Sequence, residues 1–171
     1  FSGWSVGPSI QWRPRSSLTV TSNLAYTHQG LDESQPAIED FDGLTGFVAA
    51  NLTMSNSVGL RVRAFRDISD LGGEIPLFTE RTGITFEPRW QMTTKLSSRA
   101  QFAFQRRDFN ATSLVGASRE DDYSLAELWL DFSVAPRWLL SFGVGTEQRE
   151  SSIDIYDFDD LLVHFTVRLD L

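Results

Sequence analysis

The stretch Tyr156–Leu171, YDFDDLLVHFTVRLDL, decides the fold. Apolar side chains occupy every second position from Leu161 to Leu171, and nearly all the positions between them are polar. Because successive side chains of a β-strand point to opposite faces, the pattern predicts a strand with one apolar and one polar face. It is also long enough for a tilted strand that crosses a bilayer in about 9–11 residues. The stretch therefore predicts the last strand of an outer-membrane β-barrel.

Composition is compatible with this interpretation and excludes several others. The chain has 171 residues, enough for one domain or one small barrel, and 41% of them are hydrophobic. No run approaches the roughly 18 consecutive apolar residues of a transmembrane helix. There is no cysteine, so disulfides and cysteine metal sites are excluded. A net charge of −8 argues against nucleic acid as a partner.

The same alternation recurs from one end of the chain to the other. We expect a single unit over residues 1–171, of the all-β class: a transmembrane, antiparallel, up-and-down β-barrel segment of about nine strands. No stretch has a convincing period of about 3.6 residues, so no helix is expected. The expected strands are 4–13, 18–27, 45–54, 58–64, 81–90, 96–105, 126–134, 138–147 and 161–171.

The connections between these strands alternate between short and long. Short turns are expected near 14–16, 55–57, 93–95 and 136–137, and longer, mostly acidic loops near 29–43, 67–78, 110–122 and 150–157. This asymmetry is typical of outer-membrane barrels, which have short periplasmic turns and longer external loops. Bacterial barrels of one chain normally have an even number of strands. An odd number here, with the first strand running inward, predicts the C-terminal part of a larger barrel that lacks N-terminal strands.

Three tryptophans lie beside short turns on the apolar face: Trp12, Trp90 and Trp138. Aromatic residues at one level of the outer wall predict a membrane-interface girdle. The alternative is that they are core residues of a soluble sandwich. Trp129 does not fit the girdle, because the alternation places it on the inward face.

The polar face of the expected strands is rich in charged residues. Two interpretations remain open: the charges brace the wall by pairing across strands, or the arginines bind anionic groups of a passing sugar polymer, since a guanidinium matches a carboxylate. The inward candidates are Arg61, Arg63, Arg81, Arg89, Arg99, Arg107, Arg149, Arg168, Glu127 and Asp131.

Enzyme chemistry and metal binding receive little support from the residues. The two histidines, His28 and His164, have no motif around them, and His28 is expected at an external strand end near Asp32. The acidic groups at 39–42 and 120–122 lack ordered calcium-loop spacing, so we interpret them as solvated loop charge. We therefore expect no catalytic residues, no metal and no cofactor.

The last two-fifths of the chain resemble a known family. The resemblance is carried by FQRRDF from Phe104, by REDDYSLAELWLDFSVAPRWLLSFGVGTEQRESS from Arg119, and by the closing strand, with acidic–aromatic pairs at 122–123 and 157–158. These stretches resemble the EpsL-type outer-membrane proteins encoded with exopolysaccharide-biosynthesis clusters, which are similar to the broader β-barrel porins. The resemblance implies a non-enzymatic role in polysaccharide export, with no catalytic residues to transfer.

Partners and alternatives follow from these expectations. The expected location is the bacterial outer membrane, and the expected partners are outer-membrane lipid, an anionic polysaccharide and other export-machinery proteins. A general diffusion porin shares every barrel feature and lacks only the family resemblance. A soluble, lipocalin-like ligand-binding barrel is the alternative of a different class, but it would need apolar residues inside and polar residues outside.

Overall fold

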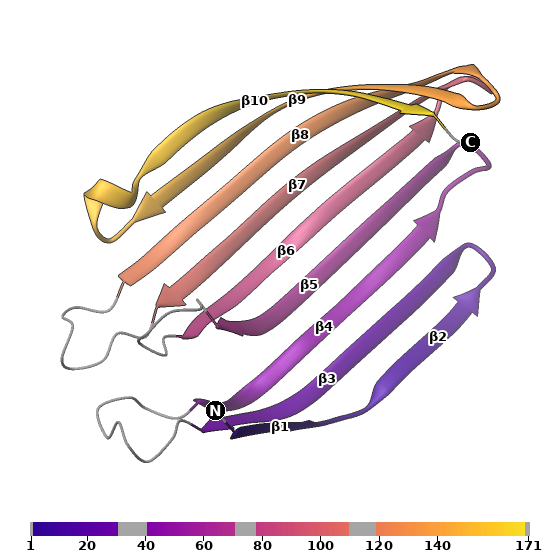
Figure 1. Cartoon of the computed structure of the whole chain (residues 1–171). Coiled ribbons are helices and arrows are strands. Elements are labelled where there is room, and N and C mark those ends of the chain that lie inside the picture. The colour runs from indigo at the N-terminus through magenta and orange to yellow at the C-terminus, as the bar shows by residue number, and fades with distance from the viewer. Residues whose placement is uncertain (1, 31–40, 71–77, 110–118, 170–171) are drawn as a thin grey trace.

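The computed structural model of the chain describes residues 2–30, 41–70, 78–109 and 119–169. These residues form one antiparallel sheet of ten strands (Figure 1). The strands are β1 (Ser2–Val6), β2 (Ser9–Arg15), β3 (Leu18–Gly30), β4 (Phe41–Thr53), β5 (Val58–Asp70), β6 (Phe78–Gln91), β7 (Leu96–Phe109), β8 (Arg119–Ala135), β9 (Trp138–Ser151) and β10 (Phe158–Leu169). The all-β, up-and-down prediction is confirmed, because each strand from β3 onward pairs with the next one along the chain.

The strand count differs from the prediction at the first edge. The expected strand over 4–13 is divided into β1 and β2, which both pair with β3, so ten strands occupy nine positions in the sheet. The division falls at Gly7 and Pro8. Proline has no N–H for the ladder, and a Cβ at Gly7 would lie 1.9 Å from the Leu24 carbonyl oxygen. Local backbone chemistry, which the alternation cannot detect, interrupts this edge.

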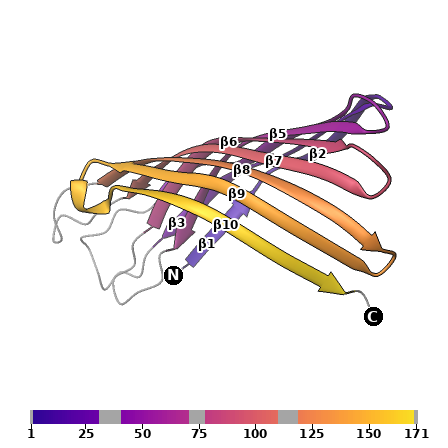
Figure 2. The same cartoon turned by 90° about the horizontal axis from the view of Figure 1, so that it is seen from above.

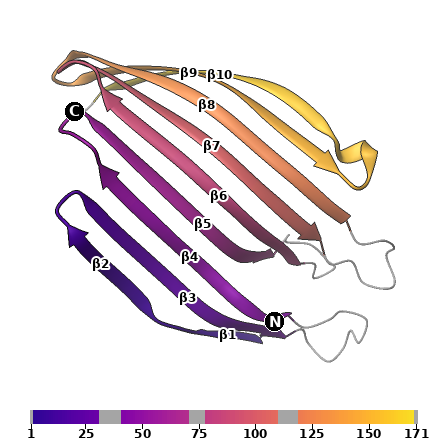
Figure 3. The same cartoon turned by 180° about the vertical axis from the view of Figure 1, so that it is seen from behind.

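The described elements form a single curved layer with two unjoined edges. Figures 2 and 3 show the strands side by side, with no second layer of described residues packed against them. Within the described ranges, β10 pairs only with β9, whereas β1 and β2 pair only with β3. The sheet is therefore open.

The two faces of the sheet differ sharply in chemistry. One, here called the apolar face, exposes a large set of hydrophobic side chains, including Phe102, Leu128 and Phe165. The opposite, polar face carries the charged residues of the central part of the sheet, such as Arg61, Arg99 and Asp131. Every described side chain that is buried lies on the polar face: Phe41, Ala49, Thr79, Ala103, Asp121 and Ser141. Side chains crowd one another on the polar face, so this face is the inner side of the curve.

The strands extend further than predicted at their long-loop ends. The strand β5 continues to Asp70 instead of ending at residue 64, and β8 begins at Arg119 instead of 126. Most outer-face positions there are polar (Arg66, Glu120, Asp122 and Ser124), so the hydrophobic alternation ends before the backbone pairing does. One short 3₁₀ turn, η1 (Asp154–Tyr156), departs from the expectation of no helix. None of the described helical residues forms a helix that could cross a membrane.

Candidate functional site

The ten charged residues that the sequence predicts to face inward all lie on the polar face, where pairing registers align them across strands. Arg61 is opposite Glu87, with 3.8 Å between Nη1 and Oε2. Arg89 is directly opposite Arg99, so two like charges are adjacent in the middle of the sheet. The full set is Arg61, Arg63, Arg81, Arg89, Arg99, Arg107, Arg149, Arg168, Glu127 and Asp131.

A continuous set of contacts crosses β7 to β10 on this face. The Nε2 of His164 lies 3.2 Å from Oε1 of Glu127, and the His164 ring stacks on Trp129 with 4.8 Å between ring centroids. The Arg99 guanidinium lies 4.7 Å from the Trp129 ring centroid, and its Nε donates to Asp131 Oδ2 at 3.2 Å. These contacts join three strands, β7, β8 and β10, through side chains alone, so this part of the polar face is braced.

Trp129 occupies the inward position that the alternation predicts for it. Its ring covers Gly143, the residue opposite it on β9, where an added Cβ would lie 2.7 Å from the indole. Glycine at 143 therefore lets the indole lie close to the sheet.

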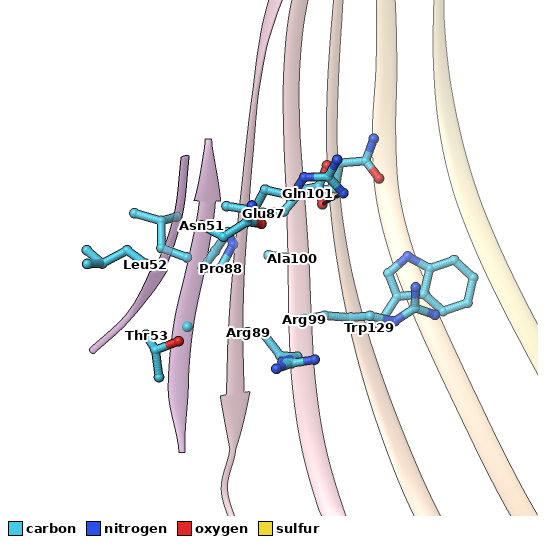
Figure 4. Close-up of a pocket in the computed structure, with 13 residues that line it drawn as sticks. Asn51, Leu52, Thr53, Glu87, Pro88, Arg89, Arg99, Ala100, Gln101 and Trp129 are labelled. Carbon is cyan, nitrogen blue, oxygen red and sulfur yellow. Dashed lines mark ion pairs between the residues drawn. The ribbon is translucent and has the colours of Figure 1, made fainter. Parts of the chain in front are cut away.

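Beside this network the polar face is hollowed. A pocket of about 360 Å³ lies over β4 to β8 (Figure 4). Its walls combine cations, amides, a carboxylate and one indole edge, a mixture suited to a hydrated, hydrogen-bonding solute. The side chains that line it with polar groups or a ring are Asn51, Thr53, Arg61, Glu87, Arg89, Arg99, Gln101 and Trp129.

A second group of charges, here called the long-loop cluster, lies on the polar face near the long-loop ends of β5 to β9. It consists of four arginines and two aspartates: Arg81, Arg107, Arg119, Arg149, Asp67 and Asp121. Asp121 is fully buried; Arg119 Nε lies 3.1 Å from its Oδ1 and Arg149 Nε lies 3.9 Å from its Oδ2. The prediction that residues 120–122 are solvated loop charge is wrong, because they belong to β8.

The connection between β9 and β10 is tied to the long-loop cluster. Arg149 Nε donates to the Tyr156 carbonyl oxygen at 2.6 Å, and the Ser151 N–H donates to Asp157 Oδ1 at 2.6 Å. The Tyr156 ring lies under the Arg119 guanidinium, 4.1 Å from its carbon. The turn η1 is thereby held against the polar end of the sheet.

The three predicted girdle tryptophans lie on the apolar face beside short turns. Trp12, Trp90 and Trp138 are 60%, 52% and 45% exposed. The sequence interpretation missed a second aromatic group at the opposite end of this face. There Trp4 packs on Tyr26 with 5.9 Å between the ring centroids, and His28 Nδ1 lies 2.9 Å from Asp42 Oδ1. The predicted neighbour of His28, Asp32, lies outside the described residues.

The register gives the relative heights of these tryptophans. Trp12 shares a cross-strand row with Phe86 of β6, and Trp90 lies four residues further toward the short turns. Trp90 in turn shares a row with Phe142 of β9, and Trp138 lies another four residues further in the same direction. The line through the three rings therefore shifts by about one residue per strand, or about 3.3 Å for each 4.8 Å of strand spacing. That line makes an angle of about 35–40° with the cross-strand rows.

The long-loop limit of the apolar face shifts in the same way. On β1 this limit is Trp4, which lies opposite His28 of β3. His28 is eight residues along β3 from Val20, and Val20 belongs to the cross-strand row of Phe86. On β10 the limit is Leu161, which lies in the Phe86 row itself. The apolar residues thus form a band of nearly constant length along each strand, with two parallel, oblique limits.

Neither a protein-family model, a curated protein nor a solved structure matches this chain. The geometry of the two faces is therefore the basis for assigning a function. Among the residues that the structure describes, no three His, Asp or Glu side chains come together as a metal site.

Two features of the polar and apolar faces were missed by the sequence interpretation, and only the first had a signal in the sequence. Trp4 and Tyr26 continue the apolar alternation toward the long-loop end, so a second aromatic level was visible in the pattern. The pairing of Asp121 with Ser151, whose Oγ donates to Oδ1 at 2.6 Å, had no such signal, because it depends on the register between β8 and β9.

Proposed function

We propose that this chain forms part of the wall of an outer-membrane β-barrel, whose polar face lines an aqueous passage for an anionic polysaccharide. It acts without catalysis: lipid covers the apolar face, and the charged polar face meets the transported polymer.

The oblique apolar band carries this proposal. Strands of transmembrane barrels tilt by about 35–45° from the barrel axis, so a membrane-parallel line crosses successive strands with a stagger of about one residue. The short-turn tryptophans and the long-loop limit of the band both follow that stagger. Eight residues at about 3.3 Å each, tilted by about 35–40°, give a height of about 20 Å, close to the roughly 25 Å apolar band of such barrels.

The inward polar face supports the same proposal against a soluble ligand-binding barrel. Such a barrel places apolar side chains inside and polar ones outside. Here the crowded inner face carries Asp121 and Ser141, while Trp90 and Phe142 are exposed on the outer side. A bilayer accounts for an exposed apolar band without a second protein layer.

Strand direction sets how the barrel closes. The edge strands β2 and β10 run the same way, because each successive pair in the sheet is antiparallel. An all-antiparallel barrel therefore needs an odd number of further strands between these edges. The proposed barrel is larger than the sheet described here.

The choice of an anionic polysaccharide rests on the family resemblance and on the arginines of the polar face. Arg63 and Arg89 have no carboxylate within ion-pair distance in the described ranges, which leaves their charge available to a solute. A general diffusion pore is the competing function, and the hollow of Figure 4, with both charge signs in its wall, fits small polar solutes as well.

Depth-dependent fluorescence quenching tests the membrane assignment. Two single-tryptophan variants are reconstituted with brominated lipids, one retaining only Trp90 and the other only Trp129, with phenylalanine at the other positions. We expect strong quenching of Trp90, greatest for bromines near the headgroup, and little quenching of Trp129. Equal quenching of the two, or a protein that is monodisperse in buffer without detergent, would contradict the proposal.

A further inference from the structure

We propose that Arg107, in the long-loop cluster, binds the carboxylate of an acidic sugar unit at the long-loop mouth of the passage. This inference rests on the proposed function, because it places the polar face in the lumen. It adds the site and the chemical group that is recognised there.

The charges around Arg107 leave it without a partner. It stands between Arg81 and Asp121 in one cross-strand row. Asp67 already accepts two hydrogen bonds from Arg81, at 2.8 and 3.1 Å. Asp121 Oδ1 accepts a hydrogen bond from Ser151 and lies 3.1 Å from Arg119 Nε, whereas its buried Oδ2 has no hydrogen-bond partner among the described residues and lies 3.9 Å from Arg149 Nε. In the part of the chain that the structure describes, Arg107 therefore has no carboxylate within ion-pair distance.

Burial makes this lack of a partner significant. The Nε of Arg107 is buried and has no hydrogen-bond partner among the described residues. Buried polar groups are normally hydrogen-bonded, and a charge removed from water is normally paired. Arg81 on β6 and Arg149 on β9 add further positive charge around Arg107. The Nε is covered, but neither Nη atom is among the buried unpaired atoms, so an incoming anionic group meets the charge through the Nη atoms.

The guanidinium is also oriented in advance. It lies over the Tyr123 ring, 4.5 Å from the ring centroid. An arginine held flat on an aromatic ring loses less side-chain freedom on binding, and its planar fork matches the two oxygens of a carboxylate.

The height of the site assigns it to a mouth. On β7 the last apolar residue of the outer face is Phe104, and the next residue on that face is the charged Arg106. Arg107 follows directly on the inner face, so it lies at the polar limit of the band. A polymer that crosses the barrel must pass this level.

Bilayer recordings of the complete reconstituted barrel, of which this chain forms part of the wall, test the site. Oligogalacturonate, a carboxylated oligosaccharide, is added on the long-loop side, and its block of the ionic current gives an apparent affinity. Parallel additions of a neutral malto-oligosaccharide and of inorganic phosphate separate a carboxylated sugar from a neutral one and from a free anion. We expect block by oligogalacturonate alone at low concentration.

Three variants assign the block to Arg107. Arg107→Gln should weaken oligogalacturonate block by about tenfold or more, the usual effect of losing a hydrogen bond to a charged group. Arg107→Lys should restore the block only in part, because the ammonium keeps the charge and loses the fork. Arg66→Gln is the matched control: it removes one positive charge at a similar height on the outer face, where Arg66 pairs with Glu80 at 2.7 Å, and should leave the block unchanged.

The outcomes separate the site from the function it depends on. A conducting channel whose block is the same in Arg107→Gln and the unaltered protein would overturn the site and leave the barrel proposal intact. Equal competition by inorganic phosphate would overturn the saccharide assignment. Failure of the unaltered protein to conduct would overturn the proposed function itself, and this placement of Arg107 with it.

Discussion

At the scale of single residues, side-chain packing on the polar face depends on where glycine allows an aromatic ring to approach the backbone. Gly143 and Gly59 lie in the same cross-strand row, which also contains Arg89, Arg99 and Trp129. A Cβ at 143 would lie 2.7 Å from the Trp129 indole, whereas a Cβ at 59 would meet nothing nearer than the Leu52 carbonyl oxygen at 3.6 Å. The same substitution therefore has different consequences at two ends of one row.

We expect Gly143→Ala to lower the free energy of unfolding by about 1–3 kcal/mol, because the indole must shift and its stack on His164 weakens. Gly59→Ala should change it by less than about 0.5 kcal/mol. Urea titrations of the protein in lipid vesicles, followed by tryptophan fluorescence, measure both. If the two glycine variants lose equal stability, the packing role of Gly143 is wrong.

At the scale of strands, alternation predicted the nine sheet positions, the order of pairing and the face of every inward candidate. These features depend on a period of two residues, which can be read from the sequence wherever the outer-face residues are apolar. Beyond the apolar band most outer-face positions are polar, so the ends of β5 and β8 were placed six or seven residues short. The contacts of Asp121 and Trp129 depend on register between strands, which one sequence does not specify.

Substitutions on opposite faces of neighbouring strands test the face assignment. Leu130 lies on the apolar face opposite Phe142 on β9, and Gln101 lines the polar hollow. We expect Leu130→Arg to reduce the free energy of membrane folding by about 2–4 kcal/mol, because it places a charge in hydrocarbon. Gln101→Arg should cost less than about 1 kcal/mol, since Glu127 lies opposite and accepts the new charge. Folding titrations into vesicles that give equal costs would reverse the two faces.

At the scale of the whole molecule, the sheet has two chemically different faces, which in the proposed barrel would meet lipid and water. In that proposal the band limits set the strand tilt, the parallel edges require an odd number of further strands, and the hollow and long-loop cluster set what the inner surface offers to a solute. Some arginines hold this wall together and others do not. Arg99 contacts both Asp131 and Trp129, whereas the contacts of Arg63 with described residues are with the rings of Phe47 and Phe65, whose centroids lie 4.8 and 5.1 Å from its guanidinium carbon.

This division predicts that selectivity and stability can be changed separately. We expect the double variant Arg63→Gln with Arg89→Gln to shift the reversal potential in a salt gradient toward cations and to lower export of an anionic polymer, while resistance to heat on gels falls less than in Arg99→Gln, because neither arginine pairs with a described carboxylate. Arg99→Gln should lower heat resistance, because Asp131 loses its cation and Trp129 loses its stacked guanidinium. Surface polysaccharide, normalised to folded barrel, is the deciding measurement. A shifted reversal potential with unchanged normalised export would favour the general diffusion pore, because the free arginines would then act on small ions and not on the polymer.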